Sequence, residues 1–199
     1  MSTTRPSRST TTARTPARVA FVGAGPGDAG LMTVRALEYL AEADAVVIDQ
    51  VAREDVVARH ARPEVEIVDA GHGEHGQPLT HASRAKLVVR AAKAHPRGLV
   101  VRLMDGDPGT FNGLAEEAAA CVKAGIPFEV VPGVSAVSAV PTYAGVPLTT
   151  TSSRGIHIIT AGEKLKDIAV AIDPAVTVVV LGQPDTLVRT LEALRGAGR

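Results

Sequence analysis

The chain has very few of the residues on which several large protein classes depend. Its 199 residues include no tryptophan, aromatic side chains make up 3% of them, and Cys121 is the single cysteine. One cysteine excludes an internal disulfide framework and is typical of a reducing compartment, so we expect a cytoplasmic protein. So few aromatic rings also argue against a surface on which single-stranded bases stack.

Charge and hydropathy also lack a strong bias. The 21 basic and 21 acidic residues give a formal net charge of zero. There is therefore no positive surplus to attract nucleic acid or an anionic membrane surface. No apolar run is long enough to span a bilayer. We predict neither a nucleic-acid partner nor a membrane partner, and the length allows one or two domains with a buried core.

The first 18 residues differ in composition from the rest. They hold many serines and threonines, no acidic residue, and the arginines Arg5, Arg8, Arg14 and Arg18. An organellar transit peptide has a similar composition, but the apolar face of an amphipathic helix is missing. Residues 1–18 are therefore predicted to be a disordered basic leader.

From residue 18 onward, short apolar runs alternate with helical periodicities. The runs predict strands at 19–22, 45–48, 65–68, 99–103, 128–131, 156–159 and 176–181. Alternating strands and helices predict an α/β fold with an open, mostly parallel sheet. In such a sheet, ligands bind near the carboxyl ends of the strands.

Two helical stripes accompany these strands. The first consists of Val34, Leu37, Leu40 and Ala41. The second consists of Leu114, Ala118, Cys121 and Val122, with Glu116 and Glu117 predicted to point outward. Cys121 lies on an apolar stripe, so we interpret it as a core residue and not as a nucleophile.

A glycine-rich turn, Gly23–Asp28, follows the first predicted strand. Glycine tolerates positive φ and has no Cβ, so such a turn brings backbone close to a ligand, while Pro26 stiffens it. The spacing differs from the dinucleotide fingerprint G-x-G-x-x-G, which would require glycine in place of Asp28.

Three more turns follow predicted strands: Asp49, then Asp105-Gly106-Asp107-Pro108, then Pro132-Gly133-Val134. In a parallel sheet all of them gather at one edge. With the Gly-Pro-Gly-Asp turn and the stretch Pro-Phe-Glu-Val-Val-Pro-Gly-Val at 127–134, the sequence resembles the tetrapyrrole methylases, and among them the uroporphyrinogen-III C-methyltransferases. The resemblance covers about residues 19–182.

The resemblance implies two α/β domains with S-adenosylmethionine in the cleft between them. Residues 19–132 correspond to the N-terminal domain and 133–199 to the start of the second, which is shorter than in the family and therefore expected to be incomplete. It also implies a small-molecule tetrapyrrole substrate, a homodimer if the second domain is complete, and a fused or associated uroporphyrinogen-III synthase.

The same resemblance implies the site residues. Cofactor contacts fall on Pro26, Asp105, Gly106, Asp107, Thr110, Ser135, Ala136 and Leu181, the last in place of a family methionine. The proposed proton acceptor falls on Asp49, for which a strand-end turn or a helix cap is the alternative.

The loop around His72 and His75, with His81 downstream, does not predict a metal site. The spacing is short and no cysteine is near enough to complete a tetrahedral ligand set. In the family this loop lies close to the tetrapyrrole. These histidines and Arg84 are therefore hypothesised to meet its carboxylate groups.

Three departures from the family pattern stand out. Asp105 replaces a glycine, so that its carboxylate either pairs with the cofactor's ammonium group or repels an acidic substrate. Gly109 and Asn112-Gly113 stand where the family has Phe and Arg, so a basic contact to substrate carboxylates is missing. Leu181 keeps an apolar contact without the sulfur.

The expected function is methylation of uroporphyrinogen III at carbon, giving precorrin-2 on the route to sirohaem or cobalamin. The sulfonium supplies an activated methyl group, and a carboxylate such as Asp49 accepts the proton that the methylated carbon loses. One alternative is another acceptor, a later precorrin or ribosomal RNA, although neutral charge and few aromatics weigh against RNA. The other is a non-catalytic domain that keeps the fold.

Overall fold

The computed structural model describes residues 16–49, 54–73, 77–161, 173–182 and 184–198. Most of the predicted leader and His75 therefore lie outside the described residues. The chain divides into two compact units. The first unit contains the residues up to Ala24 together with Met32–Gly133, and the second contains Gly25–Leu31 together with the chain from Val134 onward.

The first unit is built on a five-stranded sheet in the order β3-β2-β4-β1-β5. Every pairing in it is parallel, which confirms the predicted parallel α/β architecture. The strands are β1 (Arg18–Gly23), β2 (Ala45–Ile48), β3 (Glu66–Asp69), β4 (Leu99–Met104) and β5 (Phe128–Val131). Each lies within one residue of its predicted position at either end.

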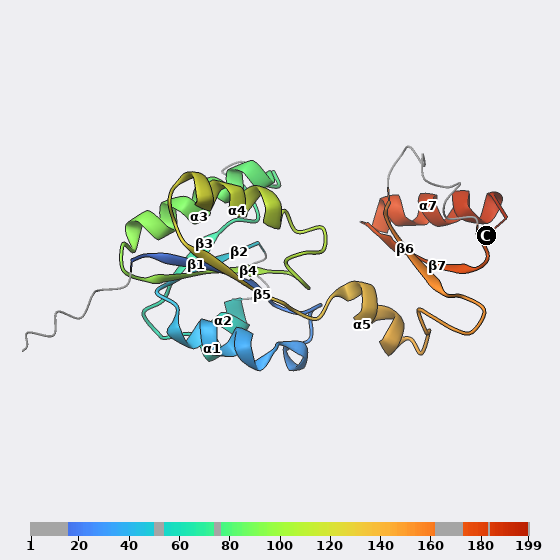
Figure 1. Cartoon of the computed structure of the whole chain (residues 1–199), viewed down its shortest axis with the longest axis horizontal. Coiled ribbons are helices and arrows are strands. Elements are labelled where there is room, and N and C mark those ends of the chain that lie inside the picture. The colour runs from blue at the N-terminus through green and yellow to red at the C-terminus, as the bar shows by residue number, and fades with distance from the viewer. Residues whose placement is uncertain (1–15, 50–53, 74–76, 162–172, 183, 199) are drawn as a thin grey trace, which may run out of the picture. The chain divides into compact units, whose positions relative to one another are not determined.

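Helices cover both faces of this sheet. They are α1 (Val34–Glu42), α2 (Glu54–His60), α3 (His81–Ala94) and α4 (Leu114–Lys123). Figure 1 shows α1 and α2 on one face and α3 and α4 on the other. Because successive side chains of a strand point to opposite faces, β1 sends Ala20 and Val22 into one apolar cluster and Val19 and Phe21 into the other.

Double coverage explains the unbroken apolar runs of the sequence. All residues of β2 and β4 are buried, and so are the five residues of β1 after Arg18. The edge strands β3 and β5 are mostly exposed or half-buried. Strands that are buried on both faces need apolar residues at every position, as these three have, with Arg102 the exception.

The second unit contains two parallel strands, β6 (Gly155–Thr160) and β7 (Val176–Leu181). Its helices are the short 3-10 turn η1 (Ala29–Leu31), α5 (Ala136–Tyr143) and α7 (Pro184–Gly196). Ser135 begins α5 as its N-cap, since its hydroxyl accepts a hydrogen bond from the Val137 N–H at 3.2 Å.

The predicted apolar stripes are only partly correct. On α1, Leu40 is buried but Val34 is 74% exposed, and the helix instead buries Ala36 and Tyr39. Val34 is the first residue of the helix, where a side chain can project beyond the sheet. Hydropathy alone does not register where a helix begins relative to the sheet that it covers.

On α4 the largest error concerns charge. Cys121 is fully buried, as predicted, but Val122 is 68% exposed, and Glu117, predicted to point outward, is fully buried. Glu117 faces the sheet because it binds Arg102, a buried residue of β4. Burial, followed by the nearby charge of Glu117, raises the pKa of the Cys121 thiol to about 11.

None of the helices described by the structure is both long and apolar enough to cross a membrane.

Candidate functional site

Three backbone segments meet where β4, β1 and β5 end. A Cβ placed on Gly23 would lie 2.6 Å from the carbonyl oxygen of Gly106 and 2.6 Å from the Cα of Gly133. A Cβ on Gly133 would collide with the same carbonyl. Glycine is therefore required at both positions, because the loops contact each other through backbone alone. The predicted gathering of turns at one sheet edge is confirmed in this unit.

Asp107 ties two of these loops together. Its Oδ2 accepts a hydrogen bond from the Gly133 N–H at 3.0 Å, and its Oδ1 accepts one from the Gly109 N–H at 2.9 Å. The Thr110 N–H donates to the Asp107 carbonyl at 3.1 Å. The Asp107 carboxylate thus shapes the loop after β4 and connects it to the loop after β5.

Asn112 stabilises the same loop from inside. Its side-chain nitrogen donates to the carbonyl of Asp105 at 2.5 Å and to the carbonyl of Asp107 at 2.6 Å. The loop also holds Gly106 at φ 63° and Phe111 at φ 57°, a conformation that costs energy for a residue with a Cβ. Sequence reasoning treated Asn112 only as the loss of a basic contact and missed this structural role.

Gly113 and His81 occupy one small volume. Gly113 has φ 73°, and a Cβ placed on it would collide with the imidazole of His81. The Nδ1 atom of His81 is buried and has no hydrogen-bond partner among the described residues. Both residues line a cavity of about 640 Å³ together with Phe111 and Phe128. His81 therefore lies where a larger side chain at position 113 would begin, a relation that sequence spacing did not reveal.

A buried ion-pair network lies beneath the loops. Arg102, which is fully buried, donates from Nε to Glu117 Oε2 at 2.7 Å and from NH2 to Glu117 Oε1 at 3.1 Å. It also donates from NH2 to Asp49 Oδ2 at 2.9 Å, with Oδ1 in ionic contact at 2.7 Å. Its NH1 donates to the carbonyls of Leu103 and Val47. The guanidinium is thus fully surrounded by acceptors.

A second arginine completes the network. The Nε of Arg84 lies 3.3 Å from Asp49 Oδ1 and donates to the carbonyl of Ala70 at 3.0 Å. Burial by itself lowers the pKa of Arg102, but its contacts with Glu117 and Asp49 outweigh burial and raise that pKa above the usual value. Two cations therefore face two carboxylates in a site that is closed to most solvent.

This network gives Asp49 a structural environment that the sequence did not predict. Asp49 follows β2, beside the end of β4, and its side chain is only 15% exposed. The ion pairs join residues that are distant in sequence, 53 positions apart for Asp49 and Arg102. No short motif could identify them, and the buried arginine was hidden within an apolar run.

In the second unit, the glycine-rich turn is linked to α5. The Asp28 Oδ2 accepts a hydrogen bond from the Tyr143 hydroxyl at 3.3 Å, and Oδ1 accepts one from the Gly30 N–H at 2.8 Å. Pro26 lies between two glycines with positive φ, and a Cβ on Gly27 would meet nothing within 4 Å. This backbone is therefore open to an approaching ligand.

Two of the predicted cofactor contacts lie around one cavity of the second unit. Ala136 and Leu181 both line a space of about 370 Å³ between α5 and β7, with apolar neighbours such as Val140 and Val179. Ser135, the neighbour of Ala136, serves as the N-cap of α5.

No group of three or more histidine, cysteine, aspartate or glutamate side chains suited to a metal ion occurs among the described residues.

Comparison with known proteins identifies the family. Residues 18–199 match the family described as Tetrapyrrole (Corrin/Porphyrin) Methylases. The chain belongs to this family. The resemblance inferred from the glycine turn and the Pro-Phe-Glu-Val-Val-Pro-Gly-Val stretch is thereby confirmed.

Solved structures are similar to this tetrapyrrole methylase over most of its length. The native uroporphyrin III C-methyl transferase from Thermus thermophilus is 35% identical, with a TM-score of 0.73, and the match covers 92% of this chain and 77% of that one. A structure of the Thermus enzyme complexed with S-adenosyl homocysteine matches with a TM-score of 0.72 at the same identity and coverage.

Curated relatives are longer proteins. Siroheme synthase 1 from Klebsiella pneumoniae is 45% identical over 133 residues, which make up 66% of this chain and 27% of that protein. Siroheme synthase from Methylobacillus flagellatus is 39% identical over 155 residues, 78% of this chain and 32% of that protein. The methylase chain thus spans about a third or less of these relatives.

Proposed function

We propose that this methylase binds S-adenosylmethionine and methylates uroporphyrinogen III at carbon, giving precorrin-2 for sirohaem or cobalamin. The observation that carries the proposal is the 35% identity to the Thermus uroporphyrin III C-methyl transferase across 92% of this chain. The two loop regions described above supply backbone that is free of side chains, as a closely bound cofactor requires.

The cofactor residues remain those implied by the family pattern. In the first unit they are Asp105, Gly106, Asp107 and Thr110, all within the loop that Asp107 and Asn112 hold in place. In the second unit they are Pro26, Ser135, Ala136 and Leu181. The exposed backbone at Gly27 and the apolar cavity beside Ala136 and Leu181 fit a ligand with both polar and apolar parts.

The reaction asks little covalent chemistry of the protein. When bound, the sulfonium of the cofactor supplies an already activated methyl group, so the protein's task is to orient the acceptor carbon. We propose that Asp49 accepts the proton released from the methylated carbon. Arg102 and Arg84 hold its carboxylate in place, and its remaining exposure is what a proton acceptor needs.

Asp49→Asn tests this role, because the amide keeps the shape but cannot accept the proton. We expect loss of turnover with S-adenosylhomocysteine binding kept. Arg84→Gln is the matched control, since it also removes one member of the ion-pair network. Equal turnover loss in both variants, with equal loss of stability, would show that Asp49 acts only through the network.

Asp105 pairs with the cofactor's ammonium group or repels the acidic substrate, and Asp105→Gly separates the two. Weaker binding of S-adenosylhomocysteine indicates pairing. Unchanged binding with a lower KM for the tetrapyrrole indicates repulsion.

A second acceptor is favoured by one observation. A cobalt precorrin-4 methyltransferase matches with a TM-score of 0.73 and 25% identity, covering 91% of this chain and 75% of that one. A later precorrin is therefore the alternative substrate. We further propose a homodimer, association with a uroporphyrinogen-III synthase, and a cytoplasmic location, the last because the single cysteine is typical of a reducing compartment.

Calorimetric titration with S-adenosylhomocysteine is the first test. Micromolar binding supports the cofactor proposal and leads to anaerobic assays with uroporphyrinogen III and cobalt-precorrin-4 in parallel. Methyl transfer to the first compound alone supports the proposed substrate, and transfer to the second alone supports the alternative. A folded chain that binds no cofactor contradicts catalysis by this chain.

A further inference from the structure

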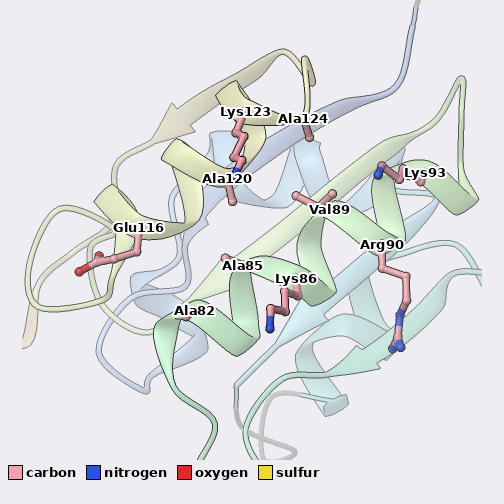
Figure 2. A pocket seen from close by; sticks show the side chains of 10 residues that line it. All are labelled: Ala82, Ala85, Lys86, Val89, Arg90, Lys93, Glu116, Ala120, Lys123 and Ala124. Carbon is pink, nitrogen blue, oxygen red and sulfur yellow. The ribbon is translucent and has the colours of Figure 1, made fainter.

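A groove lies between α3 and α4 on the outer side of the first unit (Figure 2). Its volume is about 720 Å³. The floor consists of small apolar side chains: Ala82, Ala85, Val89, Ala120 and Ala124. The charged side chains that line it are Lys86, Arg90, Lys93, Glu116 and Lys123, drawn as sticks in Figure 2. None of these residues belongs to the loops assigned to the cofactor.

The charge of this groove is strongly one-sided. Four cations and one carboxylate line it, in a chain whose formal net charge is zero. Within the described part of the chain, none of the four cations has an ion-pair partner. By contrast, other exposed arginines are paired, for example Arg59 with Asp55 at 2.9 Å and Arg62 with Asp44 at 2.6 Å. The groove therefore presents uncompensated positive charge beside an apolar floor.

The cations of α3 have a regular spacing. Lys86, Arg90 and Lys93 follow one another at i, i+4 and i+7, which places them along one side of the helix. The stretch from Ala82 to Lys93 corresponds to about 16 Å, or roughly three turns. A second helix laid along it and carrying acidic residues at the same spacing could pair with each cation.

Helix stability accounts for only part of this pattern. Lys93 and Lys123 lie in the last turns of α3 and α4, where a positive charge opposes the helix dipole. Lys86 and Arg90 lie in the middle of α3, where this effect does not apply. The alanine floor is not explained by the dipole either.

We infer that this groove docks an acidic amphipathic helix of a protein partner. An alanine floor lets a helix approach closely, at the interaxial distances of about 8–10 Å found in packed helices. Apolar residues of the partner would cover the floor, while its acidic residues would pair with the cations on either side. A small-molecule site would instead need polar groups that converge at its base, whereas the floor here is apolar.

A synthetic helix provides the direct test. The probe is a fluorescein-labelled peptide of about 16 residues with leucine and alanine on one face and glutamates flanking that face. The matched peptide carries lysine in place of every glutamate. Titrated with the full chain in low salt, the acidic peptide should bind saturably, followed by fluorescence anisotropy. The lysine peptide should bind at least about tenfold more weakly.

Charge reversal locates the binding. The double variant Lys86→Glu and Arg90→Glu should weaken the acidic peptide by at least about tenfold and strengthen the lysine peptide. The control is the double variant Arg189→Glu and Arg195→Glu on α7, which makes the same change in net charge at exposed positions. Binding that falls equally in both variants would overturn the proposal, because it would reflect net charge alone.

A neutral substitution tests the shape of the groove. Ala120 lines the groove, whereas its exposed neighbour Ala119 does not. Ala120→Phe should therefore weaken the acidic peptide several-fold while Ala119→Phe leaves it unchanged. Thermal melts of all variants confirm folding. Absence of saturable binding, or displacement of the peptide by millimolar citrate in all variants alike, overturns the docking site. The test needs no cofactor, so it is independent of the proposed activity.

Discussion

The two units of the molecule bury their strands to very different degrees. In the first unit, β2 and β4 are wholly buried between helices on both faces. In the second unit, no residue of β6 or β7 is classed as buried, and Ile156 and Ile158 are 39% and 40% exposed. Strand burial thus follows coverage on both faces, since both units have similarly apolar strands.

This difference affects the two halves of the candidate site. The loop after β4 in the first unit rests on a closely packed sheet and is held by side chains from its own sequence. The cavity beside Ala136 and Leu181 in the second unit is lined by half-exposed strand residues. We therefore expect substitutions in the first unit to have larger effects on stability than similar substitutions in the second.

The largest effect is expected from Arg102→Leu. The variant leaves Glu117 buried without its cation, and loss of one partner of a buried ion pair costs about 3–5 kcal/mol. Urea unfolding followed by circular dichroism measures the loss. Arg154→Leu, at an exposed position of the second unit, is the control and should change stability by less than about 0.5 kcal/mol. Similar losses in both variants would contradict the contrast between the units.

Glycine substitutions sharpen the same contrast. Gly133→Ala places a Cβ against backbone of two neighbouring loops, which should cost about 2 kcal/mol or more. Gly196→Ala, on α7, meets nothing within 4 Å and should stabilise the protein by about 0.5–1 kcal/mol, since alanine favours a helix. Denaturant midpoints compare the two, and a neutral Gly133→Ala would refute the close approach of the loops.

A coupling between Gly113 and His81 should give a smaller effect. Gly113→Arg introduces a side chain that collides with the imidazole and a non-glycine residue at φ 73°, for an expected loss of about 1–3 kcal/mol. His81→Gly in the same chain removes the collision, so part of the loss should be recovered. A double-mutant cycle in urea measures this coupling energy. Strict additivity of the two changes would show that the residues do not share one volume.

The smallest effect concerns pH. The pKa of Cys121 is about 11 in the folded chain against 9.0 as the ordinary value, so the folded state holds this proton more tightly. The resulting stability is fully present below pH 9 and is lost as pH rises toward 11, by about 1 kcal/mol. Tyr39, whose pKa burial also raises, contributes in the same direction.

Cys121→Ala isolates the thiol contribution. Its stability should fall less steeply than that of the unaltered chain between pH 9 and 11, because only the Tyr39 part remains. Chemical denaturation at a series of pH values provides the comparison. Parallel curves for the two proteins would exclude a role for the thiol.

Most of the strands could be predicted because their residues are apolar at every position. The run 45–48 coincides with β2, and 176–181 coincides with β7. Glu117 was assigned to the wrong face because hydropathy counts a carboxylate as exposed, whereas its position depends on a cation 15 residues away. The role of His81 was missed for a similar reason, since it lies against Gly113, in a loop far along the chain.

The sequence by itself determined the α/β alternation, the glycine turns and the family, because periodicity and short motifs are local properties of the chain. The tertiary structure alone decided the buried Arg102 network around Asp49, the shared volume of His81 and Gly113, and the cationic groove between α3 and α4. Each of these depends on contacts between segments distant in sequence. Whether a charge is buried with a partner or left exposed follows from those contacts and not from residue type.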